Sequence, residues 1–451
     1  MSQHHMIRQG APLRRQPLRR MRSLALALAG ALALLFAPAA ALAQTVRIAY
    51  IDPLSGAFAN VGEAGLRQFQ FVVDDVNRRG LAGAFKLEVV PFDSKVSPQE
   101  ALNVLKKATD AGIRIVTQGN GSSVAGALID AIDKHNERNP GKEVMFLNYA
   151  AVDPDFTNAK CSFWHFRFDA NSDMKMEALT TYMAGQKQIK NVYLINQNYS
   201  FGQAVSRAAK EYLARKRPDI KIVGDDLHPL GQVKDFAPYI AKMKAANADT
   251  VITGNWGNDM ALLVKAAKDA GFNAPFYTYY GGGLGALPAI GDAGEGKVKQ
   301  ITEWHMNIKP NKTEKFALEF NRKYGGPPAH LTFYYLRVNT QMYMLAEAMK
   351  RAKSADTIRL AYALEGMKFE ADTGEVEMRA VDHQLIQPLY ISTVARALAD
   401  GKSPKKKGKD PEVPHDLEDT GFGFKTDVRI EGYVSAQPTS CQMKRPPRPA
   451  S

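Results

Sequence analysis

Short apolar runs alternate with amphipathic segments along most of the chain, and the alternation occurs twice, before and after about residue 168. An apolar run at 45–52 predicts a buried strand, and the apolar spacing from 60 to 79 predicts a helix that Gly80 ends. Strands and helices that alternate in this way form parallel sheets with helices on both faces. The sequence therefore predicts an α/β protein with two doubly wound, Rossmann-like lobes.

The pattern changes after Gly296, where long amphipathic segments replace the alternation. Helices are predicted over 313–324, 331–353 and 357–364, and a strand over 382–391. Residues beyond Gln442 are rich in proline, which predicts a flexible tail.

The first 43 residues have the pattern of a secretory signal peptide. Six arginines precede an apolar run at 23–36, and Ala41-Leu42-Ala43 supplies a small-residue cleavage site. The run is too short to cross ~30 Å of hydrocarbon comfortably, and no cysteine follows the site to carry a lipid. We expect cleavage after Ala43 and export without a lipid anchor; an uncleaved membrane anchor is the alternative.

Composition supports a globular protein of more than one lobe. Hydrophobic residues make up 45% of the sequence and charged residues 23%, as in folded proteins, and the chain is too long for one compact core. Six positive charges of the formal net +13 lie in residues 1–43. Five lysines cluster at 401–415, but no aromatic residue stands among them, so the segment predicts a solvated insertion and no nucleic-acid site.

The chain has two cysteines, Cys161 and Cys441. In an oxidising compartment an even number of cysteines favours a disulfide. We expect the two to pair and to tie the end of the chain to its middle; two free thiols are the alternative. Two cysteines without a nearby histidine cluster cannot form a zinc site.

Motifs for catalysis are absent: the sequence contains no HExxH, GxxxxGK[ST], CxxC or GxSxG. Gly281–Gly285 resembles a phosphate loop, but Ala286 stands where the last glycine should be, which favours a flexible turn. Trp304-His305 and Asp382-His383 have no matching partner motif. We expect no enzyme, no catalytic residue, no metal and no cofactor.

Polar, small and aromatic residues follow several predicted strands, at the carboxyl ends where open α/β sheets bind ligands. Gly121, Ser122 and Ser123 end one strand and open a helix, so their amides and hydroxyls suit a carboxylate; a simple helix cap is the alternative. Other strand ends carry the small residues Ala150, Ala151 and Val152 and the aromatic residues Phe201, Trp256 and Tyr280. Together they predict an aromatic-lined cleft.

Six short motifs follow one another along the chain. They are Pro53-Leu54-Ser55-Gly56, Gly121-Ser122-Ser123, Ala150-Ala151-Val152-Asp153-Pro154, Phe166-Arg167-Phe168, Tyr199-Ser200-Phe201-Gly202 and Asp269-Ala270-Gly271. Their order and spacing resemble the periplasmic solute-binding proteins of branched-chain amino acid ABC importers, over nearly all of the chain after residue 43. The resemblance implies a type I periplasmic-binding-protein fold, in which two lobes joined by a three-strand hinge close on one small molecule.

The resemblance also implies a periplasmic monomer that delivers its solute to an ABC permease and the associated ATPase. An exported sensor subunit with the same fold is the alternative, and an exported enzyme is a weaker one. The expected organisation is a signal peptide at 1–43, a first lobe at 44–168 and 300–383, a second lobe at 169–299 and 384–442 that carries the insertion 401–415, and a tail at 443–451.

The expected ligand residues depart from those of leucine-binding relatives. Where the relatives have a hydroxyl after the small-residue pair, this chain has Val152, and Phe201 replaces a tyrosine. The relatives' glutamate for the α-ammonium falls near Tyr280, while Trp256 keeps an aromatic wall. Because an unpaired buried ammonium is costly, an aromatic or aliphatic carboxylate should fit better than an α-amino acid. A branched-chain or related amino acid stays an open alternative.

Overall fold

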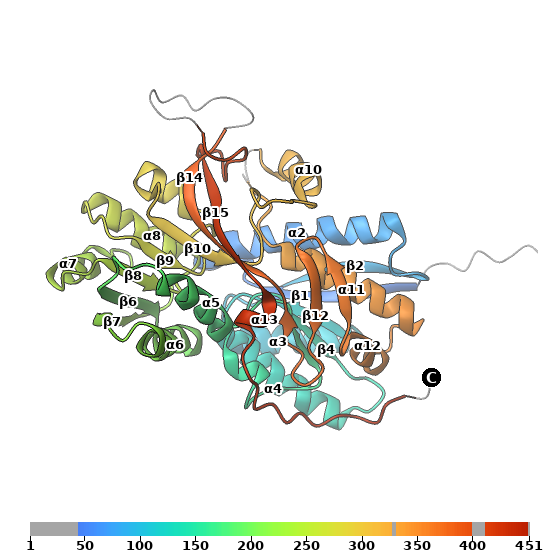
Figure 1. The fold of residues 1–451 in the computed structure, drawn as a ribbon. Helices are drawn as coiled ribbons and strands as arrows, with labels where there is room; N and C mark the ends of the chain where they lie inside the picture. Colours follow the sequence, from blue (N-terminus) through green and yellow to red (C-terminus); the bar gives the residue numbers. More distant parts are fainter. Residues whose placement is uncertain (1–43, 327–330, 399–410, 450–451) are drawn as a thin grey trace, which may run out of the picture. The chain divides into compact units, whose positions relative to one another are not determined.

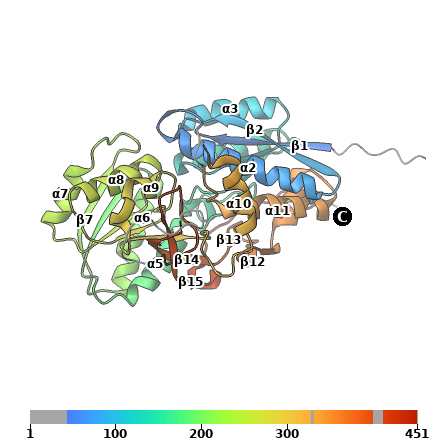
Figure 2. The ribbon, with the colours of Figure 1, turned by 90° about the horizontal axis from the view of Figure 1, so that it is seen from above.

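The computed structural model describes residues 44–326, 331–398 and 411–449. Within these ranges the chain forms two lobes, each built on one large sheet (Figures 1 and 2). No helix there is long and apolar enough to cross a membrane. The predicted signal peptide at 1–43 and most of the basic insertion at 401–415 lie outside the described residues.

The first lobe contains a parallel sheet with strand order β2-β1-β3-β4-β5. Its strands are β1 (Gln44–Asp52), β2 (Phe85–Asp93), β3 (Ile115–Gln118), β4 (Met145–Asn148) and β5 (His165–Arg167). Its helices are α2 (Ala59–Arg79), α3 (Pro98–Asp110), α4 (Ser122–Arg138), α11 (Leu336–Ala352) and α12 (Thr357–Leu364), with short 3-10 turns η1 (Gly56–Phe58) and η2 (Pro154–Thr157).

Helices cover both faces of this sheet. Ile48 and Tyr50 of β1 pack in a core with α2 and α11, whereas Ala49 and Ile51 pack in a core with α3 and α4. All four residues are fully buried. A strand buried on both faces requires an unbroken apolar run, which is what residues 48–51 supply.

The second lobe contains a seven-stranded sheet with order β15-β14-β10-β9-β8-β6-β7. Its strands are β6 (Asn191–Gln197), β7 (Lys221–His228), β8 (Thr250–Thr253), β9 (Phe276–Thr278), β10 (Val298–Thr302), β14 (Leu389–Arg396) and β15 (Phe422–Ile430). Its helices are α5 (Ser172–Ala184), α6 (Ser200–Lys216), α7 (Ala237–Ala245), α8 (Gly257–Asp269), α9 (Ala286–Ile290) and α13 (Gly432–Ser435), with the turn η3 (Gly291–Gly294). Strands β6 to β10 pair in parallel, and β14 is antiparallel to both of its neighbours.

The remaining elements lie along the connections. They are α10 (Glu314–Tyr324) and a three-stranded antiparallel sheet of β11 (Lys368–Ala371), β12 (Gly374–Met378) and β13 (Leu385–Ile386). The chain passes from one lobe to the other after β5, after β10 and after β13. The predicted α/β fold of two doubly wound lobes is confirmed.

Several elements differ from the sequence prediction for physical reasons. The predicted strand at 382–391 is two strands, because Pro388 cannot donate to a sheet and separates β13 from β14. Helix α11 begins at Leu336, five residues later than predicted. Helix α5 was not predicted, because residues on all its sides are buried and no amphipathic pattern marks it. Its start is capped by Asn171, whose side chain accepts from the amide of Met174.

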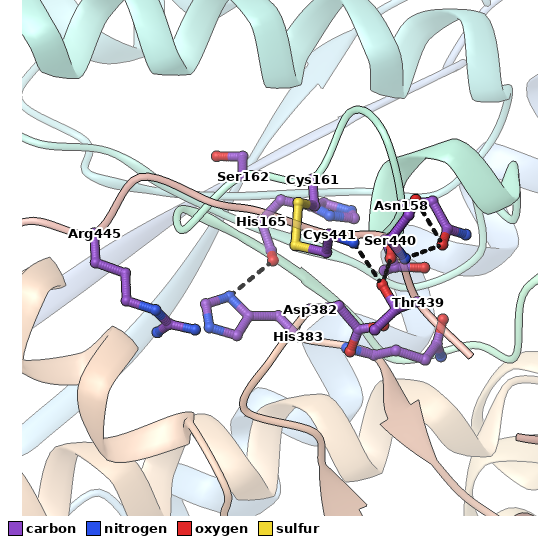
Figure 3. Close-up of a disulfide and its surroundings, with 12 residues drawn as sticks. Asn158, Cys161, Ser162, His165, Asp382, His383, Thr439, Ser440, Cys441 and Arg445 are labelled. Atoms are coloured by element: carbon purple, nitrogen blue, oxygen red, sulfur yellow. Dashed lines mark hydrogen bonds between the residues drawn. A yellow bond between two sulfur atoms is a disulfide. The ribbon is translucent and has the colours of Figure 1, made fainter. Parts of the chain in front are cut away.

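The predicted disulfide between Cys161 and Cys441 is present, and it joins residues 280 positions apart (Figure 3). Cys161 lies before β5 of the first lobe, whereas Cys441 follows α13 of the second. Beside the disulfide, Thr439 Oγ1 donates to the carbonyl of Thr157 at 2.6 Å, and Asn158 Oδ1 accepts from the amide of Ser440 at 3.0 Å. The end of the chain therefore makes a fourth passage between the lobes.

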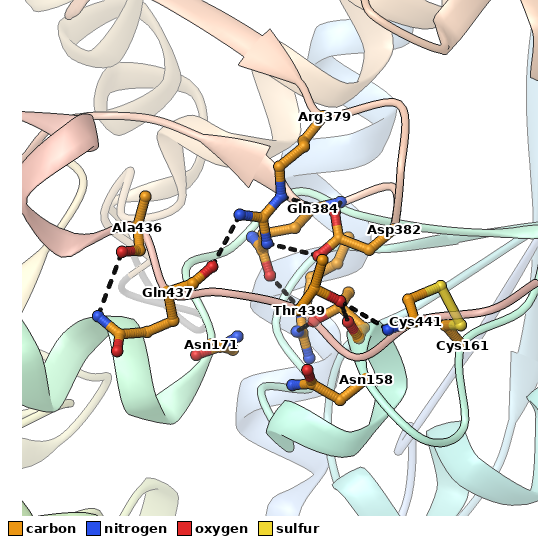
Figure 4. A network of polar contacts seen from close by, with 12 residues as sticks. Asn158, Cys161, Asn171, Arg379, Asp382, Gln384, Ala436, Gln437, Thr439 and Cys441 are labelled. Atoms are coloured by element: carbon orange, nitrogen blue, oxygen red, sulfur yellow. Dashed lines mark hydrogen bonds and ion pairs between the residues drawn. A yellow bond between two sulfur atoms is a disulfide. The ribbon is translucent and has the colours of Figure 1, made fainter.

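Residues 443–449 were predicted to form a flexible tail, but the structure places them along the first lobe. Arg445 forms an ion pair with Glu365, and the hydroxyl of Tyr362 donates to the carbonyl of Pro446 at 2.5 Å. Before the disulfide, the carbonyl of Gln437 accepts a hydrogen bond from Arg379 at 2.8 Å, and Arg379 also forms an ion pair with Asp382 (Figure 4). The proline-rich composition of the tail wrongly predicted flexibility, because the contacts that order the tail involve residues far away in the sequence.

Removing the disulfide with the pair of substitutions Cys161→Ser and Cys441→Ser should lower the free energy of unfolding by about 2–5 kcal/mol, because the unfolded chain loses a long covalent loop. Urea unfolding of the variant and of the wild type measures the difference. Intact mass of the wild type before and after reduction and alkylation is the control. Two thiols that are alkylated without reduction would contradict the pairing.

Candidate functional site

A small cavity of about 30 Å³ lies between loops that follow parallel strands of both lobes. The first lobe contributes the loops after β3 and β4, and the second lobe contributes the loops after β6, β8 and β9. The lining residues are Val61, Gly119, Asn120, Gly121, Ser122, Ala150, Ala151, Val152, Tyr199, Phe201, Trp256, Gly257, Tyr280, Gly283, Leu284, Tyr334, Tyr335 and Arg337.

Eight of the nine residues predicted to bind a ligand line this cavity; the exception is Ser123. The eight are Gly121, Ser122, Ala150, Ala151, Val152, Phe201, Trp256 and Tyr280. The carboxyl ends of strands in two separate sheets therefore converge on one space. Contact of these residues with a ligand stays a prediction.

The amino end of α4 forms the polar corner of the cavity. Gly121 precedes the helix with φ +94°, a conformation that favours glycine. Within the described residues, the amides of Ser122 and Ser123 have no hydrogen-bond acceptor. Free amides and the positive end of a helix dipole together suit a carboxylate.

Asp52, at the end of β1, holds the loop that leads to this corner. Its Oδ1 accepts from the amide of Asn120 at 2.8 Å, and its Oδ2 accepts from the hydroxyl of Tyr149 at 2.8 Å. Asp52 is fully buried, and this burial raises the pKa of its carboxyl to about 7, although the bonds from Asn120 and Tyr149 oppose the shift. The loop at this corner of the cavity is therefore held by hydrogen bonds to a carboxyl group whose pKa is about 7.

Aromatic residues of the second lobe form the opposite wall. Trp256 Nε1 donates to the hydroxyl of Tyr199 at 2.8 Å, and the ring of Phe201 lies 6.2 Å from that of Tyr280. Trp256 is only 7% exposed. Its ring also lies 4.4 Å from that of Phe58 in the first lobe. The wall thus includes a contact between the lobes.

Phe58 inserts where two glycines leave room. A Cβ on Gly231 or Gly257 would stand 2.8 Å from the ring of Phe58, and both glycines have positive φ. Phe58 itself is 5% exposed and packs with residues of the second lobe. The two lobes therefore interlock beside the cavity.

A cluster of buried charges adjoins the cavity where the chain passes between the lobes. Arg337 Nη1 lies 2.6 Å from Glu303 Oε2 and 3.1 Å from Asp169 Oδ2. Asp169 Oδ1 lies 2.9 Å from Lys175 Nζ, and this ammonium lies 5.4 Å from the ring centroid of Tyr280. All four charged side chains are at most 1% exposed. Burial acts to lower the pKa of Arg337, but Asp169 and Glu303 outweigh it and hold that pKa above its usual value.

Sequence reasoning missed Arg337, Tyr334 and Tyr335. It placed all three inside a helix, whereas the extended residues before α11 bring the two tyrosines to the cavity. An arginine followed by an apolar helix carries no signal of burial in the sequence alone. The proline and glycine residues just before 331 mark a break and were the available hint.

The residues that line the described cavity include hydrogen-bond donors but no negatively charged side chain. Among its lining residues in the described part of the chain, none is an aspartate or a glutamate. Across the same ranges, no group of three or more His, Cys, Asp or Glu residues is placed to hold a metal ion. The arrangement can bind and orient an anionic molecule with an apolar or aromatic body.

The raised pKa of Asp52 predicts a pH dependence of stability. Between about pH 4 and 7 the folded chain keeps a proton that the unfolded chain has lost, so the free energy of unfolding falls as pH rises through this window. The decline should amount to ~4 kcal/mol at most. Asp52→Asn, which cannot ionise, should lack this part of the decline. Urea unfolding of both proteins at several pH values tests this, and parallel profiles would contradict it.

Comparison with known proteins places the chain in a family. Residues 45–402 match the periplasmic binding protein family. The Leu/Ile/Val-binding protein homolog 4 of Brucella abortus is 32% identical over 436 residues, which cover 94% of this chain and 96% of that protein. The leucine-, isoleucine-, valine-, threonine- and alanine-binding protein of Pseudomonas aeruginosa is 25% identical, over 78% of this chain and 89% of that protein.

Solved structures of solute-binding proteins have the same fold as this chain. The closed conformation of the leucine-, isoleucine-, valine-, threonine- and alanine-binding protein from Brucella ovis has a TM-score of 0.74 and 30% identity, and it covers 90% of this chain and all of that one. An ABC-transporter solute-binding protein from Rhodopseudomonas palustris, in complex with 3,4-dihydroxybenzoic acid, has a TM-score of 0.69 at 19% identity, over 86% of this chain and 98% of that one, and shows the fold alone. These relatives are solute-binding proteins and not enzymes. The chain described here belongs to the periplasmic binding protein family and is homologous to branched-chain amino acid binding proteins.

Proposed function

We propose that this protein is the periplasmic substrate-binding component of an ABC importer, which captures one small organic solute and delivers it to a membrane permease. The observation that carries the proposal is the cavity, because loops from two separate sheets converge on it and all follow parallel strands. Ligands bind in open α/β sheets at such positions. The family and its ABC-transporter relatives support the same function.

The solute carries a carboxylate and an apolar or aromatic body. Ser122 at the amino end of α4 supplies the carboxylate site, and Trp256, Phe201 and Tyr280 supply the wall for the body. A branched-chain amino acid and an aromatic or aliphatic acid both have these parts. The names of the Brucella and Pseudomonas relatives favour the first class, and the bound 3,4-dihydroxybenzoic acid of the Rhodopseudomonas structure favours the second.

Capture occurs by closure of the lobes about the crossing segments. The sheet of the first lobe moves with its helices as one body, and the sheet of the second lobe, which includes β10 (Val298–Thr302), moves with its helices as the other. Phe58 of the first lobe contacts Trp256 of the second, so opening of the lobes would have to break this contact. The permease then recognises the closed form through both lobes.

A panel of solutes tests the function through thermal denaturation of the protein that begins at Gln44. The panel contains branched-chain amino acids, aromatic acids, aliphatic acids, dicarboxylates and amides. A solute at 100 times its dissociation constant should raise the free energy of unfolding by about 2.7 kcal/mol. Dicarboxylates and amides serve as controls for non-specific effects. A panel in which no solute raises the unfolding temperature would contradict the proposal.

Replacing Trp256 with alanine should weaken binding of the solute found in this panel by about 2 kcal/mol or more, as loss of a buried aromatic anchor does. Isothermal titration measures the change. Trp256→Phe is the matched control, since it keeps a ring but loses the hydrogen bond to Tyr199. Equal affinity of wild type and Trp256→Ala would show that Trp256 only packs.

A further inference from the structure

We propose that Arg337 binds a neutral oxygen of the solute, and that the solute is a carboxylic acid with a hydroxyl or oxo group and without an amine. The inference rests on the proposed function and names the solute class that this cavity selects.

The guanidinium of Arg337 has an unused donor. It lines the cavity and is 1% exposed, and its Nη1 is shared between Glu303 and Asp169. Its Nε is buried and has no hydrogen-bond partner among the described residues. Leaving a buried donor of a charged group unpaired costs free energy. A solute oxygen that accepts a hydrogen bond from Nε would remove that cost on binding.

The charge of the cluster limits what this oxygen can be. Arg337 and Lys175 carry two positive charges, and Asp169 and Glu303 carry two negative ones. The cluster is therefore neutral before the solute binds. A second carboxylate would add an uncompensated buried charge, whereas a hydroxyl or oxo oxygen accepts a hydrogen bond without adding charge.

The same cluster disfavours an amine. An α-ammonium needs a carboxylate partner, and no aspartate or glutamate is among the residues that line the described cavity. Asp169 and Glu303 lie nearby, but neither lines the described cavity, and the carboxylate of each lies within ion-pair distance of a buried cation. Asp169 forms ion pairs with Lys175 and Arg337 but accepts no hydrogen bond from the described residues, while Glu303 accepts from Arg337 and from the hydroxyl of Thr302.

Arg337 can distinguish an acceptor oxygen from an amine, which the other polar side chains of the cavity cannot do. The hydroxyls of Tyr280, Tyr334 and Tyr335 can either donate or accept, so they tolerate an amine as well as an oxygen. A guanidinium can only donate. Arg337 therefore selects an acceptor and repels a cationic donor.

Isothermal titration with two matched series tests the inference. One series is 4-methylpentanoate, 2-oxo-4-methylpentanoate and leucine, and the other is benzoate and its three hydroxybenzoate isomers. In at least one series the wild type should bind an oxygenated acid about 10- to 100-fold more tightly than its parent acid, as expected for a hydrogen bond to a charged group. Leucine should bind more weakly than 2-oxo-4-methylpentanoate.

The double substitution Arg337→Met and Glu303→Gln removes one charge of each sign and leaves the pair Asp169–Lys175 neutral. It should reduce the advantage of the oxygenated acid to about 3-fold or less, while the parent acid keeps its affinity. Tyr334→Phe is the matched control, since it removes another donor of the cavity and should keep the advantage. The wild-type comparison tests the solute class without depending on the folding of the variants, and the two variants test the role of Arg337.

Tighter binding of leucine than of the oxo acid to the wild type would overturn the inference and leave the proposed function intact. Loss of the oxygen advantage in Tyr334→Phe, with retention in the double variant, would also overturn it. Failure of every acid in both series to bind would overturn the inference together with the capture of a carboxylate that the proposed function requires.

Discussion

Four buried charges at the passage between the lobes are the constraint on which the site depends. Asp169 follows β5, Glu303 follows β10, and Arg337 is the second residue of α11, so the ion pairs join separate segments of the chain. Removing one partner of such a set strands an uncompensated charge in the interior, which costs more than the pair itself contributes. The cluster therefore fixes the path of the crossing segments, and through them it fixes where Tyr334, Tyr335 and Arg337 meet the cavity.

Contacts that do not involve a solute also hold the lobes together. Phe58 of the first lobe packs against Trp256 and beside Gly231 and Gly257 of the second. Packing of this kind lowers the free energy of the closed arrangement for any occupant. A solute then shifts the population only by the difference between its affinities for closed and open forms. Selectivity consequently depends on groups such as the α4 amides and Arg337, and not on the interlock.

The sequence was sufficient for the fold and for much of the cavity, because both depend on local patterns. Alternating apolar runs predicted the two lobes, and small or aromatic residues after strands predicted eight residues that line the cavity. The residues it missed depend on long-range partners. Arg337 looks like a helix-surface arginine until Asp169 and Glu303 are brought to it, and the two preceding tyrosines look helical until the late start of α11 is known.

The fourth passage of the chain restricts where lobe motion can be absorbed. Helix α13 packs with α5 of the second lobe, while Cys441 is covalently attached to Cys161 of the first. Between them, Gln437 contacts both sides, since Tyr212 of α6 donates to its side chain and Arg379 donates to its carbonyl. Any change in the angle between the lobes must therefore bend or slide residues 436–440. The chain thus crosses between the lobes four times, and the last crossing, which is not a strand, ends at a disulfide.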